Sequence, residues 1–239
     1  MKAVLLAAGV GSRLRPHTDR LPKALLPVAG KSILERSLQA FAELGIAEAI
    51  VVTGHLRENI EEALRRSPLP ARAVFNPRYA TANNFYSLLI AEPALAGEDF
   101  VKLDADLVFL PEVLERLLAT PGDLALALDR SVALGEEEMK ILLDGAGRVL
   151  RVSKRLPPQD CAGESIGMER IGAAFSGVLF DELRALDREG LANSYYEDAY
   201  DRLAQRGGFD FRCADVGGMR WFEIDDEKDW READRLFAR

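Results

Sequence analysis

The first 27 residues hold a glycine turn and three basic side chains that together suit a polyphosphate. The apolar run Met1–Ala8 is typical of a buried strand, and the turn Gly9–Ser12 follows it at once. Glycine lets backbone N–H groups approach a ligand closely, because no Cβ is in the way. Arg13, Arg15 and Lys23 add fixed positive charge just beyond the turn. This combination indicates binding of a polyphosphate and chemistry at one of its phosphorus atoms.

Two better-known phosphate-binding motifs do not fit this segment. A P-loop needs a Gly-x4-Gly-Lys-Ser/Thr sequence, and the chain has none. A dinucleotide fingerprint needs Gly-x-Gly-x-x-Gly, but Leu14 occupies the third glycine position. Because that glycine permits close packing of helix on strand, Leu14 argues against a dinucleotide site. The remaining Gly-x-Gly turn is also compatible with an ordinary tight turn, so the interpretation depends on its basic neighbours.

Carboxylates follow two other apolar segments of the chain. Asp104 and Asp106 come after one buried run, and Glu223 and Asp225 come after a second. Two carboxylates at a strand end can hold a hard divalent cation, and Mg²⁺ needs few of them when phosphates complete its shell. Taken alone, each segment is equally compatible with a solvated loop or a helix cap.

Strand and helix patterns alternate through the first half of the chain. Ser32 and Glu35 form a capping box that begins a helix, and apolar strands are expected at Ala49–Thr53, Phe100–Leu103 and Leu124–Leu128. This alternation implies a three-layer α/β fold in which helices cover both faces of a mostly parallel sheet. Ligands of such sheets bind beyond the carboxyl ends of the strands, where the glycine turn and the first acidic pair both fall.

The pattern changes in the second half. Met139–Leu143 and Arg148–Ser153 flank a glycine-containing turn and predict a hairpin. Ile171–Phe180 is predicted to be extended. The apolar spacing of Tyr195–Gln205 and Glu227–Phe237 predicts two late helices.

The composition fits a cytoplasmic enzyme. Hydrophobic residues make up 48% of the 239 residues, and the formal net charge of −8 argues against nucleic-acid binding through a basic surface. We expect no membrane insertion, because no apolar run reaches spanning length, and no signal peptide, because the first predicted strand starts at Met1. The two cysteines, Cys161 and Cys213, are too few for a disulfide framework and are expected to be reduced thiols.

The segments AAGVGSRLRP and PKALLPVAGK, in this order after an apolar strand, resemble the amino-terminal signature of the sugar-nucleotidyltransferase family. The resemblance implies a Rossmann-like nucleotidyltransferase fold and Mg²⁺ as cofactor. By position, it implies that Asp106 and Asp225 bind the metal, with Glu223 in support. It also implies that Lys23 neutralises the α-phosphate of the nucleotide and that Arg13 holds the leaving pyrophosphate.

Two further segments, VFNPRYA and NNFYSL, resemble the CTP:phosphocholine cytidylyltransferase branch of this family. The Gly-Thr-Ala element found in sugar-1-phosphate enzymes is missing. The amides of Asn83 and Asn84 can pair with a base edge, although a turn and a helix cap would use the same residues. The nucleotide-binding residues expected on these grounds are Leu6, Ala7, Ala8, Gly9, Gly11, Ser12, Asn83, Asn84 and Asp104.

The sequence leaves the acceptor open. A choline cation would favour an aromatic cage, although the same aromatic residues could equally pack in the core or at its rim. The candidates for such a cage, with Glu197 or Asp198 to balance the charge, are Tyr86, Tyr195, Tyr196, Tyr200 and Trp221.

Other acceptors are also compatible with the chain. The aromatic residue expected near Met139 in the choline branch is absent, and Gly163–Gly167 resembles cytidylyltransferases for aminoethylphosphonate. Lys140 and Lys154 resemble residues of enzymes that act on inositol phosphate. The acceptor-binding residues expected overall are Tyr86, Lys140, Lys154, Glu164, Tyr196, Glu197, Asp198 and Trp221.

The expected reaction is transfer of CMP from CTP to a phosphorylated or phosphonate small alcohol such as phosphocholine, which gives a CDP-alcohol and pyrophosphate. The alternatives are a sugar-1-phosphate nucleotidyltransferase and a non-catalytic nucleotide-sensing module. We expect one domain, residues 1–239, with an NTP-binding part at about 1–130 and a small β-rich acceptor lobe at about 131–239. The last helix could pack on its own sheet or support a homodimer.

Overall fold

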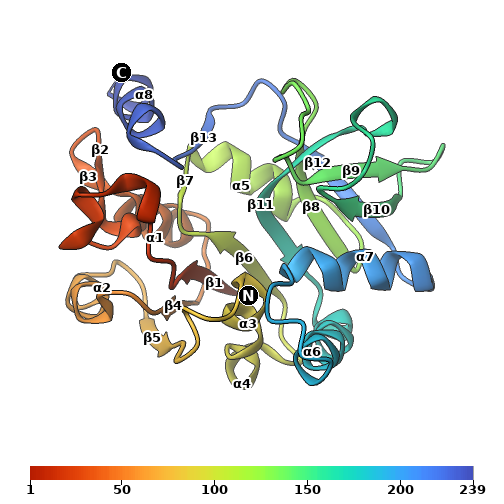
Figure 1. Ribbon diagram of the computed structural model, residues 1–239, viewed down its shortest axis with the longest axis horizontal. Helices are drawn as coiled ribbons and strands as arrows, with labels where there is room; N and C mark the ends of the chain where they lie inside the picture. The colour runs from red at the N-terminus through yellow and green to blue at the C-terminus, as the bar shows by residue number, and fades with distance from the viewer. Residues whose placement is uncertain (239) are drawn as a thin grey trace.

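The computed structural model describes residues 1–238 and is built around a central sheet of nine strands (Figure 1). Two of its strands, β10 (Val149–Ser153) and β11 (Gly163–Ile171), run against the other seven, which all point the same way. The mostly parallel α/β sheet expected from the sequence is therefore confirmed. The strand order is β10 (Val149–Ser153), β9 (Lys140–Leu143), β11 (Gly163–Ile171), β6 (Phe100–Asp104), β1 (Lys2–Ala7), β4 (Glu48–Thr53) and β5 (Ala71–Phe75), with β8 (Leu124–Asp129) on β11 and β12 (Phe211–Asp215) on β8.

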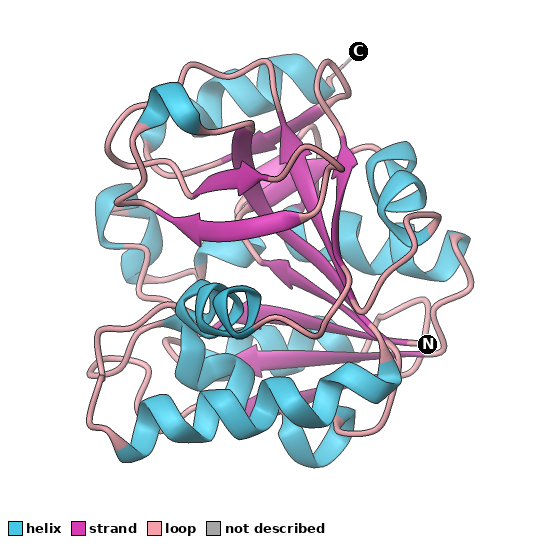
Figure 2. Cartoon of the chain, turned by 90° about the vertical axis from the view of Figure 1, so that its right-hand side faces the viewer, coloured by secondary structure: helices cyan, strands magenta, loops and turns pink. Residues whose placement is uncertain are grey.

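Helices cover both faces of this sheet, as Figures 1 and 2 show. Side chains alternate along β1, so that Ala3 and Leu5 join the apolar core on one face while Val4 joins the core on the other. The first face is covered by α1 (Ile33–Glu43), α2 (Arg57–Leu64) and α5 (Pro111–Leu118). The second is covered by α3 (Asn84–Leu89), α4 (Glu92–Leu95), α6 (Ala173–Arg188) and α7 (Tyr196–Arg206).

A smaller unit beside the main sheet joins two distant parts of the chain. β7 (Leu107–Phe109) follows β6 and pairs antiparallel with β13 (Trp221–Glu223), with Glu223 opposite Leu107. Beyond the ladder, the backbone N–H of Ile224 donates to the carbonyl of Asp106 at 3.1 Å. The hairpin of β2 (Pro27–Val28) and β3 (Lys31–Ser32) and the helix α8 (Glu227–Phe237) pack around this pair on an apolar core of their own.

The prediction that Ile171–Phe180 is extended is wrong. Only its first residue belongs to a strand, β11, and α6 then runs for 16 residues. Phe175, Leu179 and Leu183 of α6 are fully or almost fully buried at helical spacing. A ten-residue apolar window fits a strand or a buried helix equally well, and only the longer repeat distinguishes them.

The predicted hairpin and the two late helices are confirmed. β9 and β10 pair antiparallel, and both extend the central sheet. α8 begins with a capping box formed by Asp226 and Asp229. Both cysteines are free. Across residues 1–238, no helix is both long enough and apolar enough to cross a membrane.

A buried ion pair crosses the middle of the sheet. Lys102 of β6 and Glu169 of β11 are register partners in the antiparallel ladder, and both are 0% exposed. The Lys102 Nζ lies 2.9 Å from the Glu169 Oε2 and 3.1 Å from the Asp104 Oδ2. It also lies 3.5 Å from the centre of the Tyr196 ring. This lysine therefore ties β6 to β11 and to α7 at the centre of the molecule.

Replacing Lys102→Met is expected to lower the free energy of unfolding by about 3–5 kcal/mol, because it leaves buried carboxylates without their cation. The double variant Lys102→Met/Glu169→Gln should recover part of this loss, since one of those carboxylates is then neutral. The measurement is urea unfolding of the wild type and the variants, analysed as a double-mutant cycle.

The control for this cycle is Arg72→Met, which breaks the exposed pair between Arg72 and Glu48. Exposed pairs contribute little, so we expect a loss of about 1 kcal/mol or less. A Lys102→Met variant as stable as this control would contradict a structural role for the buried pair.

Candidate active site

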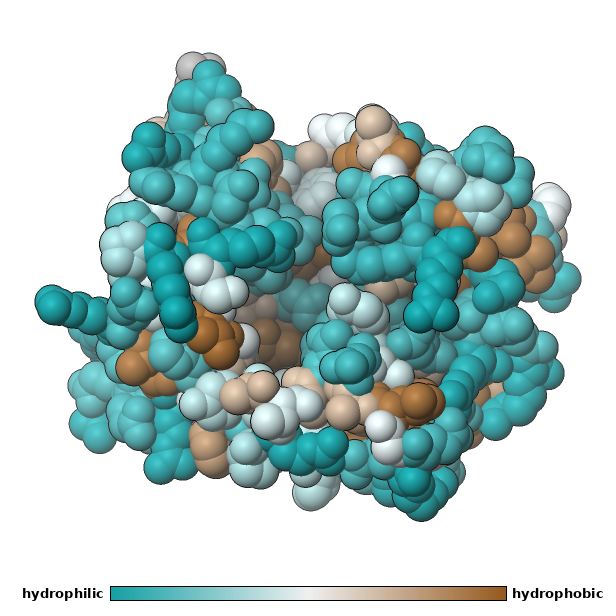
Figure 3. All heavy atoms as spheres, in the orientation of Figure 1, coloured by the Kyte–Doolittle hydropathy of each residue, from teal (hydrophilic) through white to brown (hydrophobic). Residues whose placement is uncertain are grey.

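A cavity of about 590 Å³ opens beyond the carboxyl ends of β1 and β6, where sheets of this type bind ligands. It forms the hollow near the middle of the face shown in Figure 3. One wall comes from the segment after β1, the floor from β6 and β11, and the remaining walls from α3, α7 and β13. The structure thus brings the glycine turn, both acidic motifs and part of the second half of the chain to one place.

The glycine turn lies on the cavity wall, as expected. Gly11 adopts the left-handed conformation with φ of 63°, and the Thr18 hydroxyl donates to its carbonyl at 2.8 Å. A Cβ on Gly11 would come within 3.0 Å of the Thr18 side chain, so both the backbone angle and the packing favour glycine. The predicted wall residues that line the cavity are Leu6, Ala7, Ala8, Gly9, Gly11, Ser12 and Arg13.

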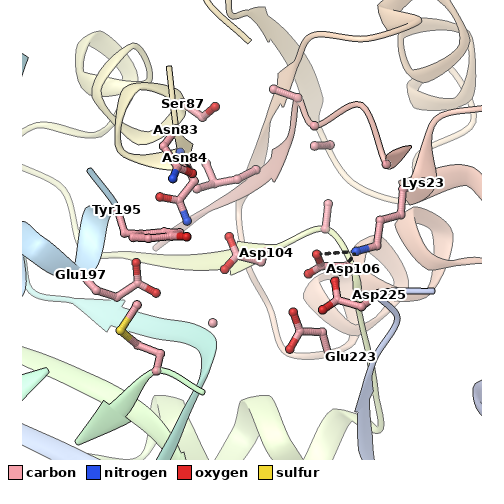
Figure 4. Close-up of a pocket in the computed structure, with 18 of the residues that line it drawn as sticks. Lys23, Asn83, Asn84, Ser87, Asp104, Asp106, Tyr195, Glu197, Glu223 and Asp225 are labelled. Carbon is pink, nitrogen blue, oxygen red and sulfur yellow. Dashed lines mark hydrogen bonds and ion pairs between the residues drawn. The ribbon is translucent and has the colours of Figure 1, made fainter. Parts of the chain in front are cut away.

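The two acidic motifs meet because β13 pairs with β7. One carboxylate oxygen from each of Asp106, Glu223 and Asp225 lies within 4.8 Å of the others. The Lys23 Nζ lies 2.8 Å from the Asp106 Oδ2 and 3.3 Å from the Asp225 Oδ1 (Figure 4). The Arg13 Nη2 lies 2.7 Å from the same Asp225 oxygen. All five predicted catalytic and metal-binding residues therefore gather at one end of the cavity.

The charge balance at this end favours a cation. Although Glu223 is exposed at the cavity surface, partial loss of hydration among the surrounding groups and the nearby charges of Asp106 and Asp225 raise its pKa to about 8. Burial opposes the charged form of Lys23, but the surrounding carboxylates outweigh it and raise the lysine pKa. Within residues 1–238, the Asp106 Oδ1 is buried and has no hydrogen-bond partner. Carboxylate oxygens with unmet capacity are ligands that suit a hard divalent cation, so the residues present fit one.

Asp104 is held on the cavity floor by groups on three sides. Its Oδ2 accepts a hydrogen bond from the Tyr196 hydroxyl at 2.6 Å and from the Lys102 Nζ at 3.1 Å. A Cβ on Gly167, which has φ of 77°, would come within 2.6 Å of the same oxygen. Gly167 lies where the pairing of β11 with β8 shifts register, so the irregular strand makes room for this carboxylate. Asp104 therefore lines the cavity in a fixed position.

Asn83 and Asn84 also line the cavity, and they partly serve the helix that follows. Asn83 is the N-cap of α3, and its Oδ1 accepts from the Asn84 N–H at 2.8 Å. The Asn84 Oδ1 accepts from the backbone N–H of Tyr196 at 3.1 Å. In the described part of the chain, the side-chain nitrogen of Asn84 makes no hydrogen bond within the protein. That nitrogen can therefore donate to a ligand.

The predicted acceptor residues separate into two groups. Glu164, Lys154 and Glu197 line the cavity. The aromatic members do not: Tyr86 lies under the Arg78 guanidinium, Tyr196 is 0% exposed, and the Trp221 Nε1 donates to Asp129.

Lys140 and Asp198 also lie outside the cavity lining. The buried Lys140 ammonium donates to the carbonyls of Gly135 and Glu138 at 2.7 and 3.0 Å. Asp198 accepts from the Tyr195 N–H at the start of α7. An aromatic cage is not assembled, because Tyr195 alone among the five aromatic candidates lines the cavity.

Several lining residues were not foreseen. Tyr79 lies in the VFNPRYA segment, which resembles the phosphocholine branch, and Met139 begins the predicted hairpin. Ser165 and Ile166 lie in the segment Gly163–Gly167, which resembles cytidylyltransferases for aminoethylphosphonate, and they belong to β11, a strand that the sequence does not predict. In the sequence, the segment that contains them lacks the regular alternation that would have revealed a strand.

Comparison with known proteins identifies the family of the chain. The sequence-family model of the MobA-like NTP transferase domain matches residues 3–192. CMP-5'-(3-aminopropyl)phosphonate synthase of Streptomyces rubellomurinus is 35% identical over 245 residues, which cover 100% of this chain and 39% of that protein. Choline-phosphate cytidylyltransferase of Streptococcus pneumoniae is 40% identical over 104 residues, 44% of each protein. The chain thus spans 39% of the length of the first relative, and its match to the second covers less than half of either protein.

Solved structures share the fold across the whole chain. The CTP:phosphocholine cytidylyltransferase LicC from Streptococcus pneumoniae superposes with a TM-score of 0.78 at 24% identity, covering 98% of both chains. The inositol-1-phosphate CTP transferase from T. maritima superposes with a TM-score of 0.80 at 19% identity, covering 98% of this chain and 95% of that one. At these identities the likeness establishes a nucleotidyltransferase-like fold.

The matched residues 3–192 include the glycine turn, Lys23, Asp104 and Asp106, the groups that the geometry gathers around the cavity. The family match and the fold agree with the resemblance that the amino-terminal motifs indicated. The chain belongs to the family of MobA-like NTP transferase domains.

Proposed function

We propose that the protein transfers CMP from CTP to a small phosphorylated alcohol or phosphonate, giving a CDP-alcohol or the CMP-phosphonate and pyrophosphate. The observation that carries the proposal is the position of Lys23, whose ammonium lies between the carboxylates of Asp106 and Asp225 beside the glycine turn. A fixed cation next to a divalent-cation site suits a triphosphate. The names of the two curated relatives support cytidine as the nucleoside and a phosphate or phosphonate as the acceptor.

The proposed reaction requires the acceptor and CTP to be positioned correctly, and it requires no nucleophile from the protein. An acceptor oxygen attacks the α-phosphorus of CTP, a new P–O bond forms, the bond to the β-phosphate oxygen breaks, and pyrophosphate leaves with that electron pair. The acceptor oxygen is already ionised at neutral pH, so no strong general base is needed. Catalysis then consists of alignment and stabilisation of the charge on the phosphates.

Each group near the phosphates has a role in this proposal. Lys23 stabilises negative charge at the α-phosphate, while Arg13 and the backbone of Gly9–Ser12 hold the leaving pyrophosphate. Asn83 and Asn84 contact the base, with Asn84 donating from its free amide nitrogen. Residues of about 1–130 bind the nucleotide, and residues of about 131–239 bind the acceptor.

Asp106, Glu223 and Asp225 would hold the divalent cation, for which we propose Mg²⁺. When bound, it would supply charge neutralisation for the phosphates. Asp104 is two residues away from Asp106 and is engaged by Tyr196 and Lys102, so we propose that it contacts the nucleotide instead.

The direct test is pyrophosphate release with Mg²⁺ and each of four NTPs, paired with a panel of phosphorylated alcohols, phosphonates and glucose 1-phosphate. Release with CTP and an alcohol phosphate or phosphonate is the expected result. Release only with glucose 1-phosphate and another NTP would show that the chain makes nucleotide sugars.

Lys23→Ala is expected to lower kcat about a hundredfold, the typical cost of losing one group that stabilises developing charge. The matched control is Lys228→Ala, which removes an exposed lysine outside the cavity and should leave kcat unchanged. Steady-state kinetics of both variants measure the effect, and turnover at the wild-type rate in Lys23→Ala would contradict its role.

A divalent cation is expected to stabilise the folded protein without any substrate. At a cation concentration of 100 Kd, the gain is about 2.7 kcal/mol, or about 5–10 °C in Tm for a domain of this size. Asp225→Asn should reduce the shift, whereas Asp181→Asn, an exposed acid on α6, should keep it. Differential scanning fluorimetry across a Mg²⁺ or Mn²⁺ titration measures these shifts, and an undiminished shift in Asp225→Asn would rule out the assigned ligands.

A further inference from the structure

The acceptor end of the cavity is lined by carboxyl groups rather than by the cations that an anionic group would favour. Glu138, Glu164 and Glu197 line this end, together with Glu137, while Lys154 is its one lining lysine. Lys154 already lies 3.7 Å from Glu137. A phosphate or phosphonate group would find carboxyl groups as its neighbours here, and the lysine among them is already paired with one of those groups. The carboxylates therefore face some other part of the acceptor.

Among these groups, all within the described residues, Glu197 is the one whose carboxylate is both buried and short of hydrogen-bond partners. It is 5% exposed and lines the cavity, and Figure 4 shows its carboxylate directed into it. Within residues 1–238, its Oε2 is buried and has no hydrogen-bond partner, and the same is true of the Ser165 Oγ on the cavity floor. Leaving a buried carboxylate oxygen unpaired is costly, so its position is best explained by a ligand that donates to it.

The charged groups that surround Glu197 inside the protein do not neutralise it. Asp104, Glu169 and Glu197 are three carboxylates around the single buried ammonium of Lys102. Burial raises the pKa of Glu197 to about 8, an effect to which Asp104 and Glu169 add and which Lys102 opposes. The cluster is therefore short of positive charge on the side that opens to the cavity.

We infer that the acceptor carries a primary ammonium group, and that Glu197 and Glu164 are the residues that select it. This inference rests on the proposed function and names the acceptor class of the same site. The substrate would be an aminoalkyl phosphate or phosphonate, with its anionic end toward Lys23 and its ammonium toward α7. The ammonium supplies a second positive charge to the group formed by Asp104, Glu169, Glu197 and Lys102, and it donates to the Glu197 carboxylate where this faces the cavity.

The aromatic residues argue for a primary rather than a quaternary ammonium. A trimethylammonium has no N–H to donate and binds to the faces of aromatic rings. Tyr196 and Tyr200 are 0% exposed, and the face of Tyr195 has the Lys154 Nζ 5.3 Å from its centre. Carboxylates and the hydroxyl of Ser165 are hydrogen-bond acceptors, and a primary ammonium offers three donors to them.

The test compares acceptors that share a two-carbon chain, at saturating CTP and Mg²⁺ and with pyrophosphate release as the readout. The acceptors are phosphoethanolamine, 2-aminoethylphosphonate, phosphocholine and ethyl phosphate. We expect kcat/KM for the better of the two amines to exceed that for phosphocholine and for ethyl phosphate by about 10- to 100-fold, the value of a hydrogen bond to a charged group. The two amines together show whether a phosphate or a phosphonate is preferred.

Variants then assign the selection to residues. Glu197→Gln keeps the shape of the side chain, and we expect it to lower the ratio of kcat/KM for the amine over ethyl phosphate about tenfold, through KM for the amine. Glu164→Gln should lower the same ratio. A purely structural role of Glu197 would reduce both acceptors alike and leave the ratio as it was. Glu115→Gln, an exposed position on α5 outside the cavity, is the matched control and should keep both the rate and the ratio.

The outcomes separate this inference from the function on which it rests. If ethyl phosphate or phosphocholine is used with CTP as well as the amines are, the ammonium inference is overturned while the cytidylyltransferase stands. If CTP yields no pyrophosphate with any acceptor, the proposed function itself is overturned. A ratio that persists in both Glu197→Gln and Glu164→Gln would overturn the assigned residues.

Discussion

The pairing of β13 with β7 is the contact on which the candidate site depends. It places Glu223 opposite Leu107 and brings Ile224 into hydrogen-bond contact with Asp106. Neither acidic motif could form a three-carboxylate cluster alone, because Asp106 comes from the loop after β6 while Glu223 and Asp225 arrive more than 100 residues later. A short two-stranded ladder outside the main sheet thus fixes the relative position of groups that repel one another.

Two lysines offset the repulsion between these carboxylates, Lys23 at the cavity and Lys102 beneath its floor. Lys23 lies at the cavity end of the acidic cluster, with Arg13 beside it. Lys102 lies beneath the floor and joins β6, β11 and α7 through Glu169, Asp104 and the Tyr196 ring. Asp104 and Asp106 are two residues apart, yet each is paired with a different lysine, and this difference gives the two carboxylates separate environments.

Local sequence features predicted much of this arrangement. The glycine turn and the first acidic motif follow β1 and β6, and neighbouring parallel strands bring their carboxyl ends to one edge whatever the details of packing. Lys23 and the second acidic motif are predicted from the resemblance of their segments, and it is the antiparallel pairing of β13 with β7 that brings the second motif to the first. The capping box of Ser32 and Glu35 likewise acts within one turn and is present as predicted. The site roles of these residues stay predictions, because their placement around a cavity does not measure binding.

Features that depend on long-range register could not be predicted in this way. Tyr196 and Tyr200 are four residues apart on α7, a spacing that suits a cage or a core, and only the packing of α7 on the sheet buries them. The Lys102–Glu169 pair requires the register of β11 against β6, and β11 was not recognised as a strand. The position of Gly167 beside Asp104 depends on an irregularity in that same strand.

The long separation between β7 and β13 also sets the order in which the molecule can be completed. A chain emerging from the ribosome has all strands of the central sheet once β12 is made, at Asp215, and can bury both large cores. It lacks two of its three clustered carboxylates until Asp225 has followed. The three-carboxylate cluster is therefore completed only after the strands of the central sheet, so a chain made as far as Asp215 can already be compact while the candidate site still lacks two of its carboxylates.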